Sequence, residues 1–250
     1  MATPTIVPVP TKINTLDKWN DFILTPEFKT IQEFFGVHLV RWFNKNGRDL
    51  PWRHTRDPYK ILLSEIMLQQ TQVDRVIGFF HRFIEQIPDF ATLAIAKEET
   101  VIELWGGLGY YNRARNLQKT AQIITNEYKG QFPTNHSEIL ALPGIGEYTA
   151  GAVMSFALNI RSPLVDTNVE RVYGRLLLQD IKLPISAAEK SKIFWLIAEQ
   201  LLPQEEYWEF NQGIMDFGAV LCKLPNPDCN KCPFSSFCRY YHRRSLSRFF

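Results

Sequence analysis

All four cysteines of the chain lie in one short segment, and their spacing restricts the fold of that segment more than any other feature of the sequence does. They are Cys222, Cys229, Cys232 and Cys238, in the pattern C-x6-C-x2-C-x5-C. Four thiols so close together in a protein of intracellular type indicate a metal site and not disulfides. The spacing predicts a four-thiolate centre and leaves both a zinc ion and an iron–sulfur cluster open.

The rest of the chain has the composition and periodicity of a helical globular protein. It has 250 residues, of which 45% are hydrophobic and 22% charged, with a net charge of +2. That composition can form a core in one large or two modest domains. Apolar residues recur at three and four positions and strand patterns are scarce, so we expect an all-α fold. The apolar segments are residues 31–43, 59–87, 100–104, 115–128, 137–142, 148–158, 169–178, 189–202 and 210–221.

A lone carboxylate, Glu65, lies inside one of these apolar segments. At helical spacing it shares a face with Ile61, Leu62 and Leu68. Burial there would favour a proton that can be donated near neutral pH. The alternative is a structural glutamate that reaches solvent or pairs with an arginine. The amide-rich residues 69–72 that follow make poor core but can hydrogen-bond to the edges of DNA bases.

Two glycines and a proline interrupt the helical pattern within the stretch ALPGIGEYTAGAV. Pro143, Gly144 and Gly146 predict a tight hairpin ahead of a helix that starts near Glu147. Backbone N–H groups at such a helix start could hold a nucleic-acid phosphate without reading its sequence. An ordinary turn between two helices is the alternative.

A second carboxylate, Asp166, stands directly before Thr167, which we predict to cap a helix through the capping box that ends at Glu170. The start of a helix stabilises an ionised carboxylate. An acid at residue 65 and an anion at residue 166 would match the pair of carboxyl groups that cleaves glycosidic bonds through an oxocarbenium-like transition state. A plain capping aspartate is the alternative.

In this order, these elements resemble the helix-hairpin-helix DNA glycosylases of base-excision repair that carry a [4Fe–4S] cluster. More narrowly, five segments are similar to those of MutY-type adenine glycosylases, which remove adenine mispaired with 8-oxoguanine or guanine. The segments are LPWRHTRDPY, SEIMLQQTQV, WGGLGYYNRARNL, LPGIGEYTAGAV and FNQGIMDFGAVLC, and the similarity runs from about Gly47 to Cys238.

The resemblance implies an all-α, two-lobed helix-hairpin-helix DNA glycosylase fold. Residues 1–30 would form an N-terminal extension, and residues 50–160 a six-helix barrel lobe that carries the hairpin. Residues 31–49 and 161–250 would form the iron–sulfur cluster lobe. The four cysteines would bind a [4Fe–4S] cluster whose role is structural or DNA-sensing and which takes no part in the hydrolysis.

The resemblance also implies roles for the two carboxylates. Glu65 would protonate N7 of adenine, and Asp166 would stabilise the sugar cation, with Tyr148 against both. Bifunctional relatives carry a lysine at the position of Tyr148. A tyrosine cannot form their Schiff base, so we predict a monofunctional glycosylase.

A further set of residues matches positions of the family that contact the base or the duplex. The adenine pocket would be lined by Trp52, Arg53, Leu68 and Gln212, the duplex would be entered by Gln69, Gln70, Thr71, Leu108 and Tyr110, and phosphates would contact Gly144, Gly146, Arg113 and Arg115. Extrusion of a base into a pocket, with side chains filling the gap, is the expected mode of recognition.

The expected partner is double-stranded DNA that contains a mismatch or an oxidised guanine, bound by a monomer. No apolar run is as long as a membrane span and no signal-peptide pattern is present, so we expect a cytoplasmic, nucleoid-associated protein without contact with a membrane.

Two alternatives to an adenine glycosylase remain from the sequence. MutY-type enzymes usually continue into a Nudix-like domain that recognises 8-oxoguanine, whereas this chain ends about a dozen residues after Cys238 and would be a short form. Short relatives that excise thymine or uracil from G:T or G:U mismatches share the Glu, Tyr and Asp frame, and this chain has VDTNV where adenine enzymes usually have VDGNV. A non-catalytic module that binds damaged DNA is the alternative from a different class.

Overall fold

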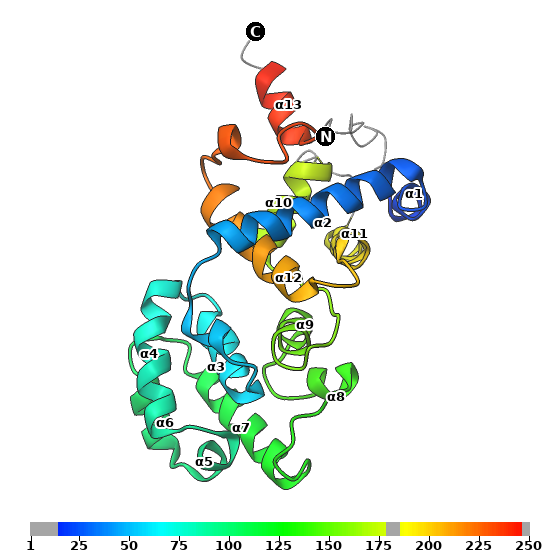
Figure 1. The fold of residues 1–250 in the computed structure, drawn as a ribbon. Coiled ribbons are helices and arrows are strands. Elements are labelled where there is room, and N and C mark those ends of the chain that lie inside the picture. The colour runs from blue at the N-terminus through cyan, green and yellow to red at the C-terminus, as the bar shows by residue number, and fades with distance from the viewer. Residues whose placement is uncertain (1–14, 179–185, 247–250) are drawn as a thin grey trace. The chain divides into compact units, whose positions relative to one another are not determined.

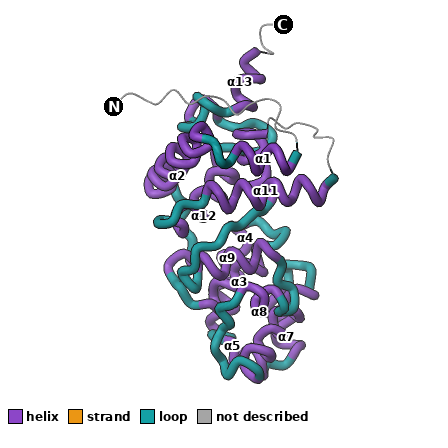
Figure 2. Tube along the Cα trace, turned by 90° about the vertical axis from the view of Figure 1, so that its right-hand side faces the viewer, coloured by secondary structure: helices purple, strands orange, loops and turns teal. Residues whose placement is uncertain are grey.

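The computed structural model describes residues 15–178 and 186–246, and within these ranges the chain forms helices and loops and no strand (Figures 1 and 2). The all-α prediction is confirmed. No helix in the described ranges has the length and apolar character needed to cross a membrane. The chain divides into two compact units, one formed by the chain up to Arg48 and from Pro163 onward, the other by Asp49–Ser162.

The first unit combines the N-terminal helices with those of the C-terminal third of the chain. Its helices are α1 (Leu16–Phe22), α2 (Pro26–Asn46), α10 (Thr167–Tyr173), the π-helical turn η2 (Gly174–Leu178), α11 (Ala187–Leu201), α12 (Tyr207–Asp216), the π-helical turn η3 (Phe217–Leu221), the short 3-10 helix η4 (Cys229–Lys231) and α13 (Arg239–Leu246). The long helix α2 packs against α12 and α11. Its core is aromatic: the ring centres of Phe35 and Phe234 lie 4.6 Å apart, and Phe210 packs edge-on against Phe35.

Part of the predicted N-terminal extension belongs to this core. Residues 1–14 lie outside the described ranges, but α1 and the start of α2 fall within residues 15–30. Thr15 and Thr25 cap these two helices, and Trp19 and Phe28 are buried at 0% and 1% exposure. A short helix with a single apolar turn has too little periodicity to be recognised in the sequence.

The second unit contains the helices that carry most of the predicted site. They are the 3-10 helix η1 (Pro51–His54), α3 (Pro58–Leu68), α4 (Val73–Gln86), α5 (Phe90–Ile95), α6 (Glu98–Trp105), α7 (Asn112–Asn126), α8 (His136–Leu140) and α9 (Glu147–Phe156). The apolar helix α3 packs against α4, α7 and α9. Helix α3 starts at a residue pair typical of helix N-termini: the Asp57 side chain accepts a hydrogen bond from the Tyr59 N–H at 2.9 Å, and Pro58 occupies the first turn.

The apolar segment 59–87 is not one continuous helix, as its periodicity suggested. It breaks after Leu68 and resumes at Val73, and the break contains Gln70 in a left-handed conformation with φ of 56°. Left-handed backbone normally favours glycine or asparagine. Because the residue in that conformation here is a glutamine, the break between α3 and α4 could not be recognised from residue type.

Candidate functional site

Glu65 lies in the middle of α3 and is 3% exposed. Seven of the eleven residues of α3 are also buried, namely Tyr59, Ile61, Leu62, Leu63, Ser64, Ile66 and Met67. A carboxylic group enclosed in this way has lost most of its hydration, which is what a proton donor that works near neutral pH requires. The predicted burial of Glu65 is confirmed, and its role as an acid stays a prediction.

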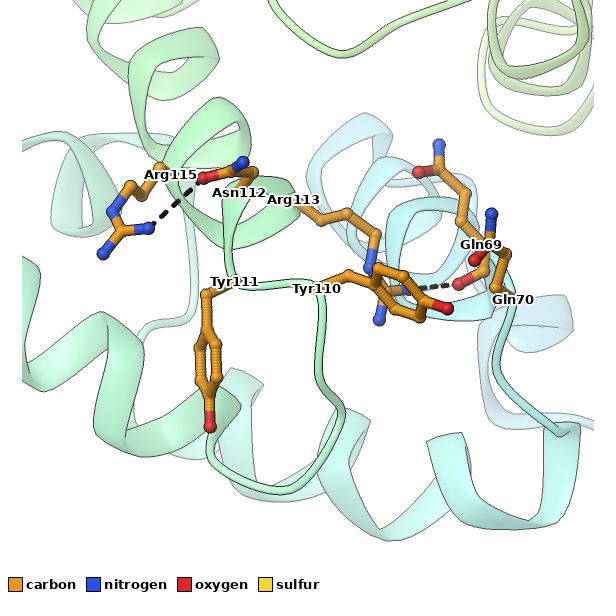
Figure 3. A pocket seen from close by; sticks show the side chains of 7 residues that line it. All are labelled: Gln69, Gln70, Tyr110, Tyr111, Asn112, Arg113 and Arg115. Atoms are coloured by element: carbon orange, nitrogen blue, oxygen red, sulfur yellow. Dashed lines mark hydrogen bonds between the residues drawn. The ribbon is translucent and has the colours of Figure 1, made fainter.

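A pocket of about 510 Å³ lies beside the end of α3, within the second unit. It is lined by Gln69, Gln70, Tyr110, Tyr111, Arg113 and Arg115, among others (Figure 3). Two short segments meet here, which we call the amide turn (Gln69, Gln70 and Thr71) and the tyrosine loop (Leu108, Gly109 and Tyr110). The structure thus brings together two segments that lie about 40 positions apart and that contain Gln70, Thr71, Leu108 and Tyr110, which were predicted together to enter a duplex.

The two predicted wedge residues of the tyrosine loop differ in exposure. Tyr110 is 63% exposed and Leu108 is 6% exposed. Leu108 is buried within the loop in this structure, and its entry into the base stack stays a prediction. Tyr110 has a left-handed backbone with φ of 49°, as Gln70 does. Non-glycine residues in this conformation are strained and concentrate at binding sites.

The two arginines predicted to contact phosphate are already engaged with protein groups. Arg115 Nε lies 2.7 Å from the Glu98 carboxylate, and both side chains are exposed. Arg113 is directed into the second unit and donates to backbone carbonyls at the end of α3 and in the tyrosine loop. Its contacts are those of a structural arginine, which the sequence did not indicate.

The predicted hairpin connects α8 to α9. Gly144 has φ of 79°, and a Cβ placed there would lie 2.9 Å from the Asn116 Cβ of α7. The hydroxyl of Thr120, also in α7, donates to the Pro143 carbonyl at 3.1 Å. Gly144 thus allows the hairpin to turn and to lie close to α7.

Gly146 has a different function in the hairpin. It is the N-cap residue of α9, no side chain caps the helix at this point, and a Cβ placed there would meet nothing within 4 Å. The first N–H groups of a helix lack intrahelical partners and favour an anion. Tyr148 lies in this first turn of α9 and is half-buried.

Gly144→Ala should lower the midpoint of thermal unfolding by an amount that corresponds to about 1–3 kcal/mol, because alanine is strained at positive φ and its methyl group would collide with α7. Gly146→Ala is the matched control, since that backbone has φ of −104° and open space beside it. Differential scanning fluorimetry of both variants checks the prediction. Equal losses at the two positions would contradict it.

Three of the residues predicted to line the adenine pocket, Trp52, Arg53 and Leu68, lie in the second unit and are buried or half-buried. Trp52 is 4% exposed in η1 and packs edge-on against Phe80 at 5.5 Å. Arg53 follows it and is half-buried, and Leu68 is the last residue of α3.

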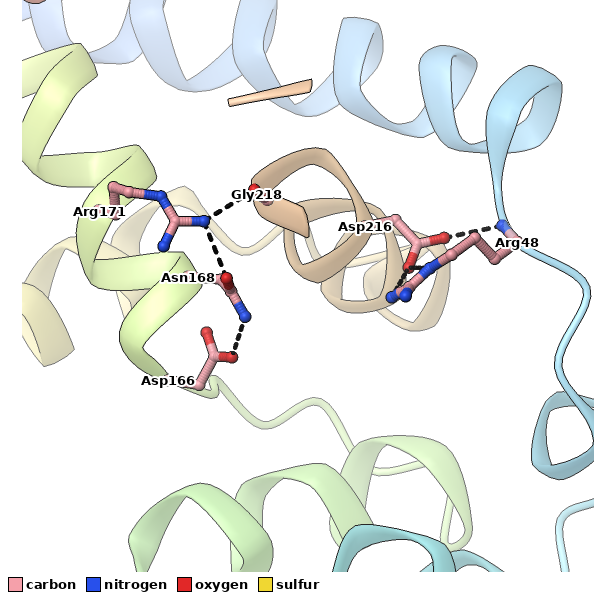
Figure 4. A network of polar contacts seen from close by, with 6 residues as sticks. All are labelled: Arg48, Asp166, Asn168, Arg171, Asp216 and Gly218. Carbon is pink, nitrogen blue, oxygen red and sulfur yellow. Dashed lines mark hydrogen bonds and ion pairs between the residues drawn. The ribbon is translucent and has the colours of Figure 1, made fainter. Parts of the chain in front are cut away.

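Asp166, in the first unit, is the N-cap of α10, so the prediction that Thr167 caps this helix is wrong. Its Oδ1 accepts the Val169 N–H at 2.7 Å, and its Oδ2 accepts the Asn168 side-chain amide at 2.8 Å. Asp166 stands directly before the helix and its carboxylate accepts the N–H of Val169, three residues on, so Thr167 is the first residue of the helix and not its cap. Both carboxylate oxygens are therefore fixed in direction (Figure 4).

A chain of polar contacts leads from Asp166 through Asn168 and Arg171 to Gly218 (Figure 4), and Arg171 continues it to the first cysteine. Arg171 Nη2 donates to the Asn168 side-chain oxygen at 2.8 Å and to the Gly218 carbonyl at 2.7 Å. Arg171 Nε donates to the Cys222 carbonyl at 3.0 Å. A Cβ at residue 218 would lie 2.8 Å from the Asn168 Cβ, so glycine allows η3 to approach α10.

Gln212 lies on α12 and is 4% exposed. The end of the same helix is held by Asp216, which is fully buried and bonds to Arg48 through the backbone N–H at 2.8 Å and the Nε at 2.9 Å (Figure 4). These partners are 168 residues apart, so sequence spacing did not reveal the pair.

The four cysteines lie in the first unit, and two of them, Cys222 and Cys238, contact a buried arginine. Arg175 Nη1 donates to the Cys222 carbonyl at 2.9 Å and lies 3.5 Å from the Cys222 sulfur, and the Cys238 thiol donates to the Arg175 carbonyl at 3.5 Å. Burial, together with the neighbouring thiols, raises the pKa of Cys232 to about 12 and that of Cys238 to about 11. Such thiols give up their protons when a metal binds them.

These surroundings fit an anionic metal cluster. Arg175 is 4% exposed, and within the described residues its Nε has no hydrogen-bond partner. A buried guanidinium beside the Cys222 sulfur would be balanced by the negative charge of a cluster bound to thiolates. Among the described residues, no group of three or more His, Cys, Asp or Glu side chains is arranged so that it could bind a metal ion. The four-thiolate centre therefore stays a prediction.

Comparison with known proteins identifies relatives over most of the chain. Residues 63–195 match the model of the HhH-GPD superfamily base excision DNA repair proteins. The chain is 41% identical to the adenine DNA glycosylase of Buchnera aphidicola subsp. Baizongia pistaciae over 213 residues, which cover 85% of this chain and 60% of that protein. The chain thus spans about three fifths of the length of this relative.

Other relatives are matched over nearly their full length. The thymine/uracil-DNA glycosylase of Methanothermobacter thermautotrophicus is 35% identical over 215 residues, which cover 86% of this chain and 96% of that protein. The structure of a thermostable thymine-DNA glycosylase superposes with a TM-score of 0.79 at 34% identity and covers 86% of this chain and 99% of that one.

Proposed function

The chain belongs to the HhH-GPD superfamily of base excision DNA repair proteins, and from this premise we propose that it is a monofunctional DNA glycosylase. Its substrate is adenine mispaired with 8-oxoguanine or guanine in double-stranded DNA, and it acts as a monomer in the cytoplasm. The observation that carries the proposal is the 41% identity to an adenine DNA glycosylase across 85% of the chain. The burial of Glu65 supports the chemistry, because a binding module does not need an enclosed acid.

The proposed reaction begins when the target adenine leaves the base stack. Gln70 and Tyr110, both exposed beside the pocket, enter the duplex as the base swings out. The base is then received by Trp52, Arg53, Leu68 and Gln212. Gly146, at the start of α9, holds a backbone phosphate.

Glu65 then donates its proton to N7 of the adenine. The N-glycosidic bond breaks, its electron pair leaves with the base, and the base departs neutral. The positive charge that develops on the sugar is stabilised by Asp166. A water molecule adds its hydroxide to the sugar and returns a proton to the Glu65 carboxylate, while Asp166 stays ionised. Tyr148 has no amine, so no Schiff base forms and the DNA strand stays intact.

A thymine or uracil glycosylase for G:T and G:U mismatches is the second candidate. It is supported by the 35% identity to a thymine/uracil-DNA glycosylase over 86% of this chain and by the TM-score of 0.79 to the structure of a thymine-DNA glycosylase. The Glu, Tyr and Asp positions are compatible with either base.

One panel of duplexes separates the two candidates. The protein is incubated with duplexes that contain A:8-oxoG, A:G, G:T and G:U, and the products are treated with hot alkali to reveal abasic sites. We expect cleavage of the adenine strand in the first two duplexes. Cleavage confined to the thymine or uracil strand would replace the adenine assignment by the second candidate.

Cys222, Cys229, Cys232 and Cys238 would hold a [4Fe–4S] cluster. When bound, the cluster would brace the loop between η3 and α13, which contains all four residues, and would supply no step of the hydrolysis. Because Arg171 of α10 donates a hydrogen bond to the Cys222 carbonyl, a loop fixed by the cluster would also fix the position of this arginine.

Cys232→Ser should lower the iron content of the purified protein from about four per chain and reduce its broad visible absorbance, because a cubane cluster is held by four thiolates. Ser236→Ala, an exposed position in the same loop, is the control and should keep the wild-type iron content. Iron and zinc are measured together by plasma mass spectrometry. Stoichiometric zinc in place of iron would refute the cluster and favour a zinc site.

A further inference from the structure

Arg113 contacts both segments that we expect to enter DNA. It lies in the first turn of α7, and its side chain reaches the end of α3 (Figure 3). Its Nη1 donates to the carbonyl oxygens of Ile66 at 2.9 Å and Met67 at 3.0 Å, and also to that of Gln69. The last carbonyls of a helix have no partner within the helix. Arg113 therefore caps α3 and fixes the start of the amide turn.

The other terminal nitrogen of Arg113 contacts the second segment. Nη2 donates to the carbonyls of Leu108 and Gly109, each at 3.2 Å, and to the hydroxyl of Thr71 at 3.3 Å. The guanidinium carbon also lies 5.5 Å from the centre of the Trp105 ring and 5.4 Å from that of Tyr110. One planar group thus joins the amide turn to the tyrosine loop.

Both segments have backbones that need such support. Gln70 and Tyr110 have left-handed φ angles of 56° and 49°. Strained conformations of this kind persist only where the surrounding structure holds them. The Arg113 guanidinium donates hydrogen bonds to both segments and therefore supports the two backbones together.

From these contacts we infer that Arg113 is a positioning residue for base extrusion and not a phosphate contact. It holds the amide turn and the tyrosine loop as one preformed wedge, so that neither has to become ordered while the duplex opens. The inference rests on the proposed function, because it concerns the step in which the target base leaves the stack. Loss of Arg113 should slow that step and leave the ionic part of DNA binding unchanged.

An arginine is required for this contact because of its shape. Its planar fork presents two terminal nitrogens with fixed directions, and a lysine presents one compact charge. Arg113→Lys keeps the charge and removes the fork, whereas Arg113→Gln removes both. A positioning role predicts the same kinetic defect in the two variants.

The test compares excision of one base from two duplexes under single-turnover conditions. In the first duplex the target base is paired with its mismatched partner. In the second duplex it lies opposite an abasic site, so no base pair has to break before the base is extruded. We expect both Arg113 variants to lose about tenfold or more on the mismatch and about threefold or less on the second duplex, because an unpaired base is easier to extrude. A merely structural defect would lower both rates equally.

DNA affinity is measured in parallel at several salt concentrations. The slope of log affinity against log salt should equal that of the wild type, whereas loss of one phosphate contact would reduce its magnitude by about 0.9. Arg82→Gln is the matched control, since Arg82 donates to the Leu104 carbonyl at the end of α6 at 2.8 Å, in the same unit. It should keep the wild-type ratio of the two rates.

Three results would overturn the inference: a reduced salt slope, equal defects on the two duplexes, or full activity of Arg113→Lys. If the wild-type protein excises no base from either duplex, the proposed function fails and this inference fails with it.

Discussion

Glu65→Gln should reduce the single-turnover rate of adenine excision about a thousandfold and leave DNA affinity within about twofold of the wild type. The reason is that glutamine has nearly the shape of glutamate and no proton to give. At 3% exposure, Glu65 has little water beside it that could take over the proton transfer. The rate is measured with enzyme in excess on an A:8-oxoG duplex, and affinity by fluorescence anisotropy on the same DNA.

Glu99→Gln provides the control for this variant. Glu99 is an exposed glutamate in the first turn of α6, so its loss should change neither quantity. Excision by Glu65→Gln at the wild-type rate would remove the acid from the proposed reaction. A loss of affinity as large as the loss of rate would show that Glu65 instead maintains the DNA-binding surface.

Several parts of the fold follow directly from local sequence. The start of α3 depends on Asp57 and Pro58, whose preference for the first turn of a helix is intrinsic to each residue. The burial of Glu65 follows from the apolar residues at helical spacing on both sides of it. Gly144 indicated the hairpin because few other residues adopt positive φ at low cost.

Other features depend on contacts that local sequence does not encode. The amide turn has no glycine or proline and is held by Arg113, more than 40 residues away. Arg48 and Asp216 meet only after the two ends of the first unit have come together. Such interactions are decided by tertiary structure, so residue type alone could not predict them.

Asp166→Asn should reduce the excision rate by about a hundredfold to a thousandfold, because a neutral amide no longer stabilises the positive charge that develops on the sugar. The helix itself should persist. Asparagine caps helices about as well as aspartate, and its oxygen can still accept the Val169 N–H. Its amide nitrogen would face the side-chain amide of Asn168, whose own oxygen is held by Arg171. The lost hydrogen bond should cost about 1 kcal/mol of stability.

A large loss of rate with a small loss of stability would distinguish the effect of the Asp166 charge from the effect of its helix cap, which a larger substitution would remove together. Asp89→Asn is the matched control, because the Asp89 carboxylate caps α5 through the Thr92 N–H at 2.7 Å. If capping alone explained the effect of Asp166→Asn, the two variants would lose similar stability and neither would lose excision. A hundredfold or greater loss of rate at residue 166, with thermal unfolding shifted by only a few degrees, would support the proposed role of the Asp166 charge in stabilising the sugar cation. Retention of the wild-type rate would leave Asp166 as a helix cap and would require another group to stabilise the cation.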